Sequence, residues 1–547
     1  MTKAKKPVEI ELKLVLDSPE REPAVVKKMR EQGYKLEQAD HVRNIDIYLD
    51  TFDWLLMKNK LSLRYRLTNG TAIYTLKSMG TVNEGIAKRM EKEIQLDKAV
   101  PVPSDIGVKQ INELIDDIIY PRKLLEHIQI RTDRRLYKVV SPESAEIELC
   151  FDTSNFSTRG LHEPKRARKL QEMEAEIISG SEKALRSLAT LISRTFHLQP
   201  SSSSKLEVAI DRLKVTIPSK KPPEELRVRL EDRLDLAVRK ILTYQFQRFR
   251  EQIPGVQRDI DIEFVHQARV ATRRMRSLLS LFHNAVSSNV GEYFGRELKW
   301  LGKKFGAVRD LDVFLLNLSE FKKQIEYFPA KNKKVFEDWI ENHRSASLKA
   351  LIDVFESSRY NNFEKRIISF LERSLPARPH ASDAIKPVSE VAPILINNIY
   401  DAVIKQGHAV LANPKLKEFH LLRIQMKRLR YACEFMAPAY GGTFDKFIDR
   451  TVEIQDCLGQ IQDTVFTRGF IDYLFEDWRS KLVEPALVFI LGEIYQLQAE
   501  IAREKQGGFR KMWEHFASEE TSSELNDVLS IQTATDKSQA VLGTTLK

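Results

Sequence analysis

The sequence predicts a multidomain protein of mixed α and β class, in which an antiparallel sheet or barrel with flanking helices is followed by an all-α region. Three observations lead to this expectation. The chain has 547 residues, too many for a single hydrophobic core. Short runs of alternating polarity recur up to about residue 215, and long helical periodicity follows from residue 224.

Each part of the N-terminal region carries its own local signal. Alternation with a period of two predicts strands over 9–15, 45–49, 61–67, 72–77, 91–96, 146–151 and 172–178, and we expect a further strand over 205–215. Helices are expected near 19–32, 105–117 and 181–196. Many short antiparallel strands of this spacing are typical of a sheet that closes on itself.

Proline-rich segments mark the domain boundaries. The stretch Pro218–Pro223 contains three prolines and two lysines, which is typical of a linker. We therefore expect a first domain over 6–215, a linker over 216–223 and a helical domain over 224–516. A break at 376–387 divides the helical domain into halves of about 224–376 and 388–516. Residues 517–547 are rich in serine, threonine and aspartate, and we expect them to be disordered.

The bulk composition excludes several classes of protein. A hydrophobic content of 42% and a charged content of 30% are typical of a soluble globular protein, and we find no apolar run long enough to cross a membrane. The three cysteines form no CxxC pair, so neither a disulfide framework nor a structural zinc site is expected, and a reducing cytoplasm fits best. The net charge of +10 indicates a polyanionic partner.

Paired charges on single strand faces are the main functional signal of the N-terminal region. Residues two apart share a face of a strand, so Glu9, Glu11 and Lys13 point one way. The same pairing occurs for Arg64 with Arg66, Glu91 with Glu93, Glu146 with Glu148, and Glu172 with Glu174 and Glu176. One such strand would suit a solvated sheet face. Five of them, segregated by sign, favour a closed sheet with a wet lumen that carries both charges.

Such a lumen would be costly without a ligand, because buried like charges repel and lose hydration. Paired carboxylates are hard oxygen donors that suit Mg²⁺ or Mn²⁺. Rows of arginine and lysine match phosphate oxygens. A metal ion combined with a cationic clamp is the chemistry of phosphoryl transfer, although the sequence does not identify a general base.

Six motifs, in this order, resemble the CYTH domain of the triphosphate tunnel metalloenzyme family. They are Glu9-x-Glu11-x-Lys13, Tyr48-Leu-Asp50-Thr51, Leu63-Arg64-Tyr-Arg66, Thr75-Leu-Lys77, Arg89-x-Glu91-x-Glu93 and Glu172-x-Glu174-x-Glu176. The resemblance covers roughly residues 6–215. It departs from the family pattern after Ser204-Lys205, where the Arg-Gly that often follows is missing.

The resemblance implies an eight-stranded antiparallel barrel that forms a tunnel. It also implies metal-dependent hydrolysis of inorganic triphosphate, with thiamine triphosphatase, nucleoside triphosphatase and adenylate cyclase activities as alternatives within the family. Carried over by position, the divalent metal would be held by Glu9, Glu11, Glu172, Glu174, Glu176 and Asp152. The phosphate path would be lined by the catalytic cations Lys13, Arg64, Arg66, Lys77, Arg134 and Lys205.

An internal repeat divides the helical region into two related units. The segment 266–276 aligns with 420–430 at an offset of 154 residues, and every basic position is kept. The segment 305–310 aligns with 458–463 at an offset of 153 residues. Two markers at nearly one offset indicate duplicated bundles, packed about a pseudo-two-fold axis. In each copy the basic residues form a stripe opposite an apolar stripe.

This helical half resembles the CHAD domain, the conserved-histidine α-helical domain, over about residues 224–516. One basic stripe is typical of a solvated helix face, but two stripes facing each other would repel unless a polyanion lay between them. The resemblance implies two helical bundles with a basic pocket that binds inorganic polyphosphate. The residues carried over are His266, Arg269, Arg273, Arg274, Arg276, Arg309, His420, Arg423, Lys427, Arg428 and Arg430. Gln462 stands where the first half has Arg309, so the halves need not bind equally.

Two other functions stay open at this stage. A non-catalytic protein would hold polyphosphate with both domains, although a site for anions alone needs few carboxylates. The helical half could instead bind nucleic acid, whose backbone affinity falls steeply with salt.

Overall fold

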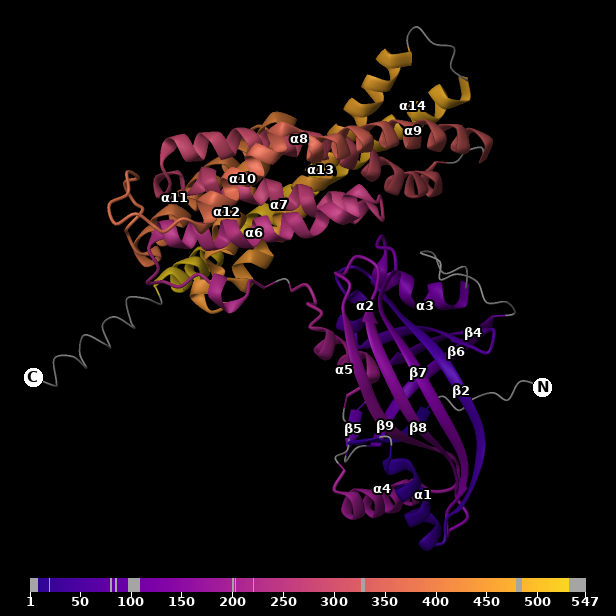
Figure 1. Cartoon of the computed structure of the whole chain (residues 1–547). Coiled ribbons are helices and arrows are strands. Elements are labelled where there is room, and N and C mark those ends of the chain that lie inside the picture. The colour runs from indigo at the N-terminus through magenta and orange to yellow at the C-terminus, as the bar shows by residue number, and fades with distance from the viewer. Residues whose placement is uncertain are drawn as a thin grey trace, which may run out of the picture. The chain divides into compact units, whose positions relative to one another are not determined.

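The computed structural model describes residues 8–18, 20–78, 81–83, 86–96, 109–198, 201, 203–219, 221–325, 330–478 and 485–530. The chain forms two compact units, Met1–Lys220 and Lys221–Lys547. The first unit is built mainly from strands and the second from helices (Figure 1).

Antiparallel strands build the first unit. They are β1 (Val8–Val15), β2 (Lys35–Asp50), β3 (Leu61–Thr68), β4 (Thr71–Ser78), β5 (Thr81–Asn83), β6 (Ile86–Leu96), β7 (Leu125–Val140), β8 (Glu146–Thr158) and β9 (Arg166–Ser179). The strand order is β1-β9-β8-β7-β2-β3-β4-β6, and β6 pairs back with β1, so eight strands close into a barrel. The short β5 only extends the edge of β6. The predicted eight-stranded antiparallel barrel is therefore confirmed.

Alternation along the strands turns apolar side chains outward, where helices cover them. Leu12 and Leu14 of β1 are fully buried in a core shared with α1 (Arg21–Glu31) and α4 (Glu182–Phe196). A second core joins β3 and β4 to α2 (Leu55–Lys58) and α3 (Lys109–Ile119) through Leu56 and Ile115. The helices predicted near 19–32, 105–117 and 181–196 are confirmed as α1, α3 and α4. The polar residues between the apolar ones are left to face the interior.

The segment predicted as a strand over 205–215 is a helix, and that prediction is wrong. Helix α5 (Lys205–Leu213) begins with a capping box: the Glu207 N–H donates to the Ser204 hydroxyl, and the Ser204 N–H donates to the Glu207 carboxylate. Leu206, Ala209 and Leu213, spaced three or four residues apart, pack against strands of the barrel. The apolar spacing alone suits a short strand or a short helix, and the cap decides between them.

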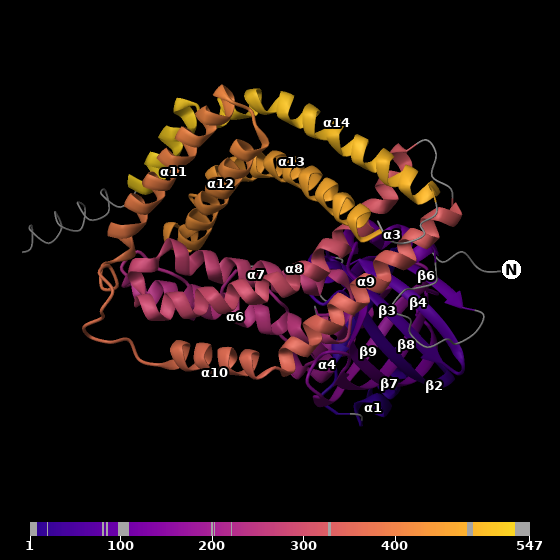
Figure 2. The ribbon, with the colours of Figure 1, turned by 90° about the horizontal axis from the view of Figure 1, so that it is seen from above.

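The second unit is helical throughout its described residues, which confirms the predicted all-α domain. Its helices are α6 (Leu234–Gln257), α7 (Ile262–Leu281), α8 (Ser288–Gln324), α9 (Ala330–Glu356), α10 (Ser358–Glu372), α11 (Val388–Ala412), α12 (Leu416–Met436), α13 (Asp445–Trp478) and α14 (Pro485–Phe516). The order of α6–α9 is repeated by α11–α14 (Figure 2).

The two sets of helices meet at two places. Helices α7 and α12, which carry the repeated basic segments, pack against each other. A separate apolar core is shared by α8, α9, α13 and α14, with Phe314, Phe336, Ile471 and Ile490 at its centre. The repeated halves are thus fixed against one another by two separate contacts.

The C-terminal segment differs in part from the expected disorder. Residues 519–530 form a helix whose Leu525, Val528 and Leu529 are buried. The expectation of disorder from residue 517 is therefore wrong over this stretch, because apolar residues three or four apart give it one buried face. Residues 531–547 lie outside the described residues. Within the described part of the chain, every helix is too short or too polar to span a lipid bilayer.

Candidate functional site

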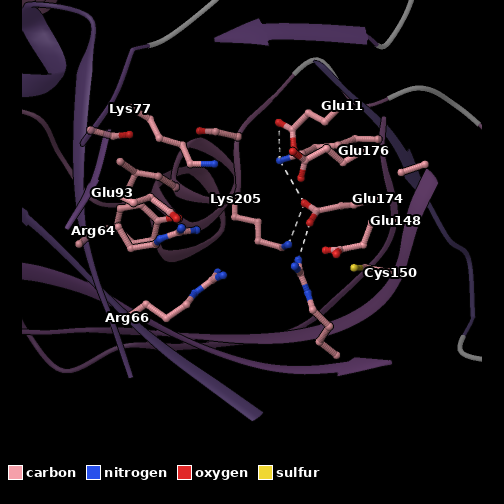
Figure 3. Close-up of a pocket in the computed structure, with 17 residues that line it drawn as sticks. Glu11, Arg64, Arg66, Lys77, Glu93, Glu148, Cys150, Glu174, Glu176 and Lys205 are labelled. Carbon is pink, nitrogen blue, oxygen red and sulfur yellow. Dashed lines mark hydrogen bonds and ion pairs between the residues drawn. The ribbon is translucent and has the colours of Figure 1, made fainter. Parts of the chain in front are cut away.

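Charged side chains of the barrel converge on one internal cavity of about 180 Å³, roughly ten times the space that one buried water needs. Strands β1, β8 and β9 supply carboxylates on one side, and β3 and β4 supply cations on the other (Figure 3). The charged lining residues are Lys13, Arg64, Arg66, Lys77, Arg134, Lys205, Glu11, Glu93, Glu148, Glu174 and Glu176. The cavity therefore offers room and both signs of charge to a small polyanion.

Glu174 of β9 lies at the centre of a buried ion-pair network. Its carboxylate is 3.1 Å from Nζ of Lys13, 2.8 Å from Nζ of Lys205 and 2.5 Å from Nη2 of Arg134. Burial alone would raise the pKa of Glu174, but the three cations outweigh burial and hold this pKa well below its usual range. Glu174 is therefore ionised at neutral pH and orients three cations at once.

Lys13 of β1 connects Glu174 to a second carboxylate. Its Nζ is 3.3 Å from Oε1 of Glu11, which lies on the same face of the strand. Burial would lower the pKa of Lys13, yet Glu11 and Glu174 raise it above the usual lysine value. The lysine is held as a cation inside the barrel.

Lys205 enters the site from the first turn of α5 and donates to Oδ2 of Asp152 over 2.5 Å. Arg134 of β7 grips the same carboxylate with two hydrogen bonds, from Nε at 2.8 Å and from Nη2 at 2.6 Å. Burial opposes the charge on Lys205, but Asp152, Glu174 and Glu172 raise its pKa. Such charge-assisted, two-pronged contacts fix both cations in place.

Glu172 is fully buried on β9, two residues before Glu174. Within the described residues neither of its oxygens accepts a hydrogen bond, and its ion pair with Lys205 is long, at 3.7 Å. Burial raises the pKa of Glu172 above the usual carboxyl value, although Lys205 counteracts it. This carboxylate is under-satisfied, which marks a place where an added cation would be stabilising.

The opposite wall carries arginines on β3 and a lysine on β4. Arg66 donates from Nε and Nη2 to Asp46 over 2.6 and 2.8 Å, which locks its guanidinium in place. Arg64 donates from Nη2 to the Thr75 hydroxyl over 3.1 Å. Lys77 extends from β4 beside them (Figure 3). The tyrosine between the two arginines, Tyr65, is buried on the outer face, so strand alternation explains why both arginines point inward.

Most of the predicted barrel residues come together at the cavity. Glu11, Glu174, Glu176 and all six predicted cations line it, whereas Asp152 and Glu172 contact the cations from behind. Glu9 belongs to β1, but its side chain lies outside the described residues. Sequence reasoning noted the strand pairs containing Glu93 and Glu148 without assigning them to the site, and it missed Asp46. The same alternation that placed Arg64 could have placed all three.

The donor set fits a divalent metal ion by its chemistry. Glu11, Glu148 and Glu176 bring hard carboxylate oxygens to one wall, and Glu172 has oxygens that no described residue satisfies. Glu11 faces Glu176 in the β1–β9 register, and Glu176 faces Glu148 in the β8–β9 register. Among the described residues no group of three such side chains is already close enough to enclose an ion. The carboxylates that contact lysine would have to release it to bind a metal.

A basic cluster forms in the second unit where α7 meets α12. Arg269, Arg273 and Arg309 from the first half lie near Arg423 and Lys427 from the second, and the mutual charge repulsion acts across the halves. Each of the four arginines has a buried nitrogen that donates no hydrogen bond within the described residues. The two repeated stripes thus do converge, and part of their hydrogen-bonding capacity is left unused.

Lys427 shows the electrostatic strain of this cluster most clearly. Burial, reinforced by Arg423, Arg273 and Arg269, lowers the pKa of Lys427 to about 7. The carboxylate of Asp463 counteracts this shift only in part. A polyanion would relieve the repulsion and favour the charged form.

The other predicted basic residues are placed differently. Arg274 pairs with Glu434 and stacks on Phe435 at 5.1 Å, so it helps to join α7 to α12. Arg430 pairs with the same Glu434 within α12. Arg276 and Arg428 are exposed, and His266 is partly buried on α7. His420 donates from Nδ1 to Oε1 of Gln462 over 2.7 Å. In the sequence repeat, Gln462 stands at the position that Arg309 occupies in the first half.

The fold and site define a two-domain protein: a charged tunnel barrel joined to a helical domain with a basic cluster. A family model described as CYTH domain matches residues 8–210, and one described as CHAD domain matches residues 240–472. The chain therefore belongs to the proteins that carry an N-terminal CYTH domain and a C-terminal CHAD domain. CYTH tunnel enzymes are triphosphatases or cyclases that act on triphosphates and use divalent metals.

The individual relatives are distant. The uncharacterized protein Rv2226 of Mycobacterium tuberculosis (strain ATCC 25618 / H37Rv) is 26% identical over 249 residues, which are 44% of this chain and 45% of that protein. The CHAD domain from the plant Ricinus communis is 21% identical, with a TM-score of 0.41, and covers 53% of this chain and 97% of that one. The adenylyl cyclase HpAC1 from Hippeastrum, described as having a dominant triphosphatase activity, is 19% identical, with a TM-score of 0.28, and covers 37% of this chain and 95% of that one. Likenesses at these scores add nothing about activity.

Proposed function

We propose that the barrel hydrolyses inorganic triphosphate to pyrophosphate and phosphate with bound Mg²⁺ or Mn²⁺, and that the helical domain binds inorganic polyphosphate. The proposal for the barrel rests on one observation: a single cavity brings the carboxylates of β1, β8 and β9 together with the cations of β3 and β4. Cations alone would suffice to hold an anion. The added carboxylates are the donors that a divalent metal requires.

The ion pairs around Glu174 are suited to an exchange of partners. Lys13, Lys205 and Arg134 all contact this carboxylate. A bound triphosphate would attract the three cations, and the released Glu174 would join Glu11, Glu172 and Glu176 around the metal. Every buried charge keeps an opposite charge in both states, so the exchange avoids the cost of an isolated buried ion.

The chemical step then needs little covalent participation by the protein. Water attacks the terminal phosphorus, the bond from this phosphorus to the bridging oxygen breaks, and pyrophosphate leaves with the electron pair. When bound, the metal would polarise terminal phosphate oxygens. Arg64, Arg66 and Lys77 would stabilise the charge that develops on the transferring group and on pyrophosphate.

Phosphate release by the full chain tests this activity. The substrates are triphosphate, longer polyphosphates, ATP and thiamine triphosphate, each with Mg²⁺, Mn²⁺ or a chelator, and cyclic AMP is measured in parallel with ATP. We expect phosphate from triphosphate only with a divalent metal, and a loss of about 100-fold or more in kcat for Arg64→Ala. Arg43→Ala, which changes an exposed arginine of the same sheet, is the matched control. Triphosphate that binds but survives with both metals would support the non-catalytic alternative instead.

Polyphosphate binding by the helical domain is supported by the unsatisfied arginines of α7, α8 and α12. We expect Arg423→Ala to weaken the binding of long-chain polyphosphate about tenfold, since it removes a charged donor from the cluster. Lys417→Ala, an exposed change on the same helix, should have little effect. Competition between polyphosphate and duplex DNA at physiological salt decides the remaining alternative, because displacement of polyphosphate by equimolar DNA would favour a nucleic-acid partner.

A further inference from the structure

A second cavity in the helical unit adjoins the basic cluster and differs from it in chemistry. It lies between α8, α9 and α13 and is lined largely by aromatic side chains: Trp339, His343, Phe466, Phe470 and Tyr473. Ala307 and Asp310 of α8 line this cavity and also line the groove between α7 and α8 that contains Arg269, Arg273 and Arg276. The cationic groove and the aromatic cleft are thus neighbours that share Ala307 and Asp310 in their walls.

The aromatic cleft has the features of a stacking site. The ring centroids of Trp339 and His343, one turn apart on α9, are 3.7 Å apart with a tilt of 30°. On the facing helix α13, Phe466 and Phe470 are stacked, and Tyr473 is 58% exposed, which is unusual for a residue that could pack. Gly469 of α13 also lines the cavity and borders open space, since a Cβ built there would meet no atom within 4 Å.

Polar groups lie at the junction of the cationic groove and the aromatic cleft. His343 donates from Nδ1 to the Trp339 carbonyl over 2.8 Å, which leaves Nε2 as a hydrogen-bond acceptor. Asp310 at the junction lies near Arg269 and Arg309, and burial raises its pKa above the usual carboxyl value. A carboxyl group beside a phosphate-binding groove suits a sugar, because its oxygens can accept hydrogen bonds from the sugar hydroxyls.

We propose that the helical domain binds nucleoside oligophosphates, with the phosphate chain on the basic cluster and the base stacked in the cleft between α9 and α13. The phosphate half of this site rests on the proposed polyphosphate binding. The aromatic half is independent of it, because inorganic polyphosphate has no group that could use stacked rings. Bases of any identity can stack on aromatic side chains. This stacking is strong enough to favour an oligophosphate that carries a nucleoside over an inorganic oligophosphate.

The experiment compares two ligands of equal phosphate number on the full chain in a chelating buffer: adenosine 5′-tetraphosphate and inorganic tetraphosphate. We expect the nucleoside ligand to bind about tenfold more tightly. Gly469→Leu fills the cleft from an exposed helical position, and it should remove this preference while leaving the affinity for inorganic tetraphosphate unchanged. Gly492→Leu, the same change at an open position of α14, should keep the preference.

Photolabelling locates the base and separates the helical domain from the barrel. An azido derivative of adenosine tetraphosphate should label peptides of α9 or α13, and excess long-chain polyphosphate should suppress the label. Labelling confined to residues 8–215, or a preference that survives Gly469→Leu, would overturn the inference. Tight binding of inorganic tetraphosphate without any preference would reject the base site and leave polyphosphate binding intact. No binding of either ligand to the helical domain would reject both.

Discussion

Nζ of Lys205 and Oδ2 of Asp152 lie 2.5 Å apart inside the barrel, with 8% and 0% of their side-chain surfaces exposed. This contact joins the first turn of α5 to strand β8. A buried ion pair thus holds together two elements that are distant in sequence, and its lysine is one of the cations of the candidate site.

Lys205→Met should therefore affect both stability and function. Removing the lysine leaves Glu172 without its ion pair and weakens the hold on Glu174, and breaking a buried pair from one side typically costs about 3 kcal/mol. We expect the free energy of unfolding of the barrel to fall by roughly this amount, and phosphate release to fall with it. Urea denaturation followed by far-UV circular dichroism measures the first effect. Lys183→Met on the exposed start of α4 is the control, and equal midpoints for the two variants would contradict the buried network.

The error at Lys205 shows what the sequence could and could not decide. Alternating polarity predicted most strands of the barrel and the inward direction of Arg64 and Glu174, because successive side chains of a strand point to opposite faces of the sheet. The apolar spacing of 205–215 fits both periods, yet Ser204 and Glu207 form a capping-box pattern that is visible in the sequence and favours a helix. Strand β7 was not predicted, because its centre carries buried polar residues on both faces, such as Gln129 and Thr132.

Acid should weaken the barrel through Glu174. Its pKa is held well below the usual value of 4.5, so its ion pairs contribute stability above pH 4.5 that is lost as pH falls through the lower, folded-state pKa. We expect Glu174→Gln to be less stable than the natural chain at about pH 7, by roughly 2–4 kcal/mol. The difference should shrink only as pH falls through the lowered, folded-state pKa, where the natural carboxylate also becomes neutral. Urea midpoints at a series of pH values measure this, and a constant difference at all pH values would contradict it.

Close packing of the second helical half depends on Gly407. A Cβ built at this position of α11 would lie 1.8 Å from the buried ring of Trp513 on α14, so a methyl group forces the helices apart. We expect Gly407→Ala to reduce the free energy of unfolding by about 2 kcal/mol through overpacking. Gly492→Ala, where nothing lies within 4 Å, should instead raise stability slightly through helix propensity. Thermal melts of the two variants should therefore shift in opposite directions.

The helical half was easier to predict at the level of motifs than of contacts. The repeat placed the basic stripes on α7 and α12 and indicated that they face one another. The pairing of Arg274 on α7 with Glu434 on α12 depends on how the halves pack, which periodicity within one helix does not specify. The aromatic cleft could not be foreseen either, because Trp339 and Phe470 belong to different helices whose faces meet only in the folded chain.

Lys427 should make the proposed binding of polyphosphate sensitive to pH near neutrality. Its pKa is lowered from 10.5 to about 7 by burial and by Arg423, Arg273 and Arg269, so at about pH 8 the free protein holds it mostly neutral. A polyanion raises this pKa, and binding at about pH 8 should therefore take up a proton. Below about pH 6 the lysine is already charged and uptake should vanish. Affinity should accordingly rise as pH falls from about 8 to about 6.

Titration calorimetry in buffers of different ionisation enthalpy measures this proton uptake directly. Lys427→Arg keeps the positive charge and should bind polyphosphate without uptake, because a guanidinium stays protonated. Lys427→Met should bind more weakly and also show no uptake, whereas Lys417→Met on the exposed face of α12 should behave as the natural chain does. For the natural chain, a binding heat that is the same in every buffer would show that no proton is taken up. Lys427 would then be charged before the ligand binds, which would contradict the prediction.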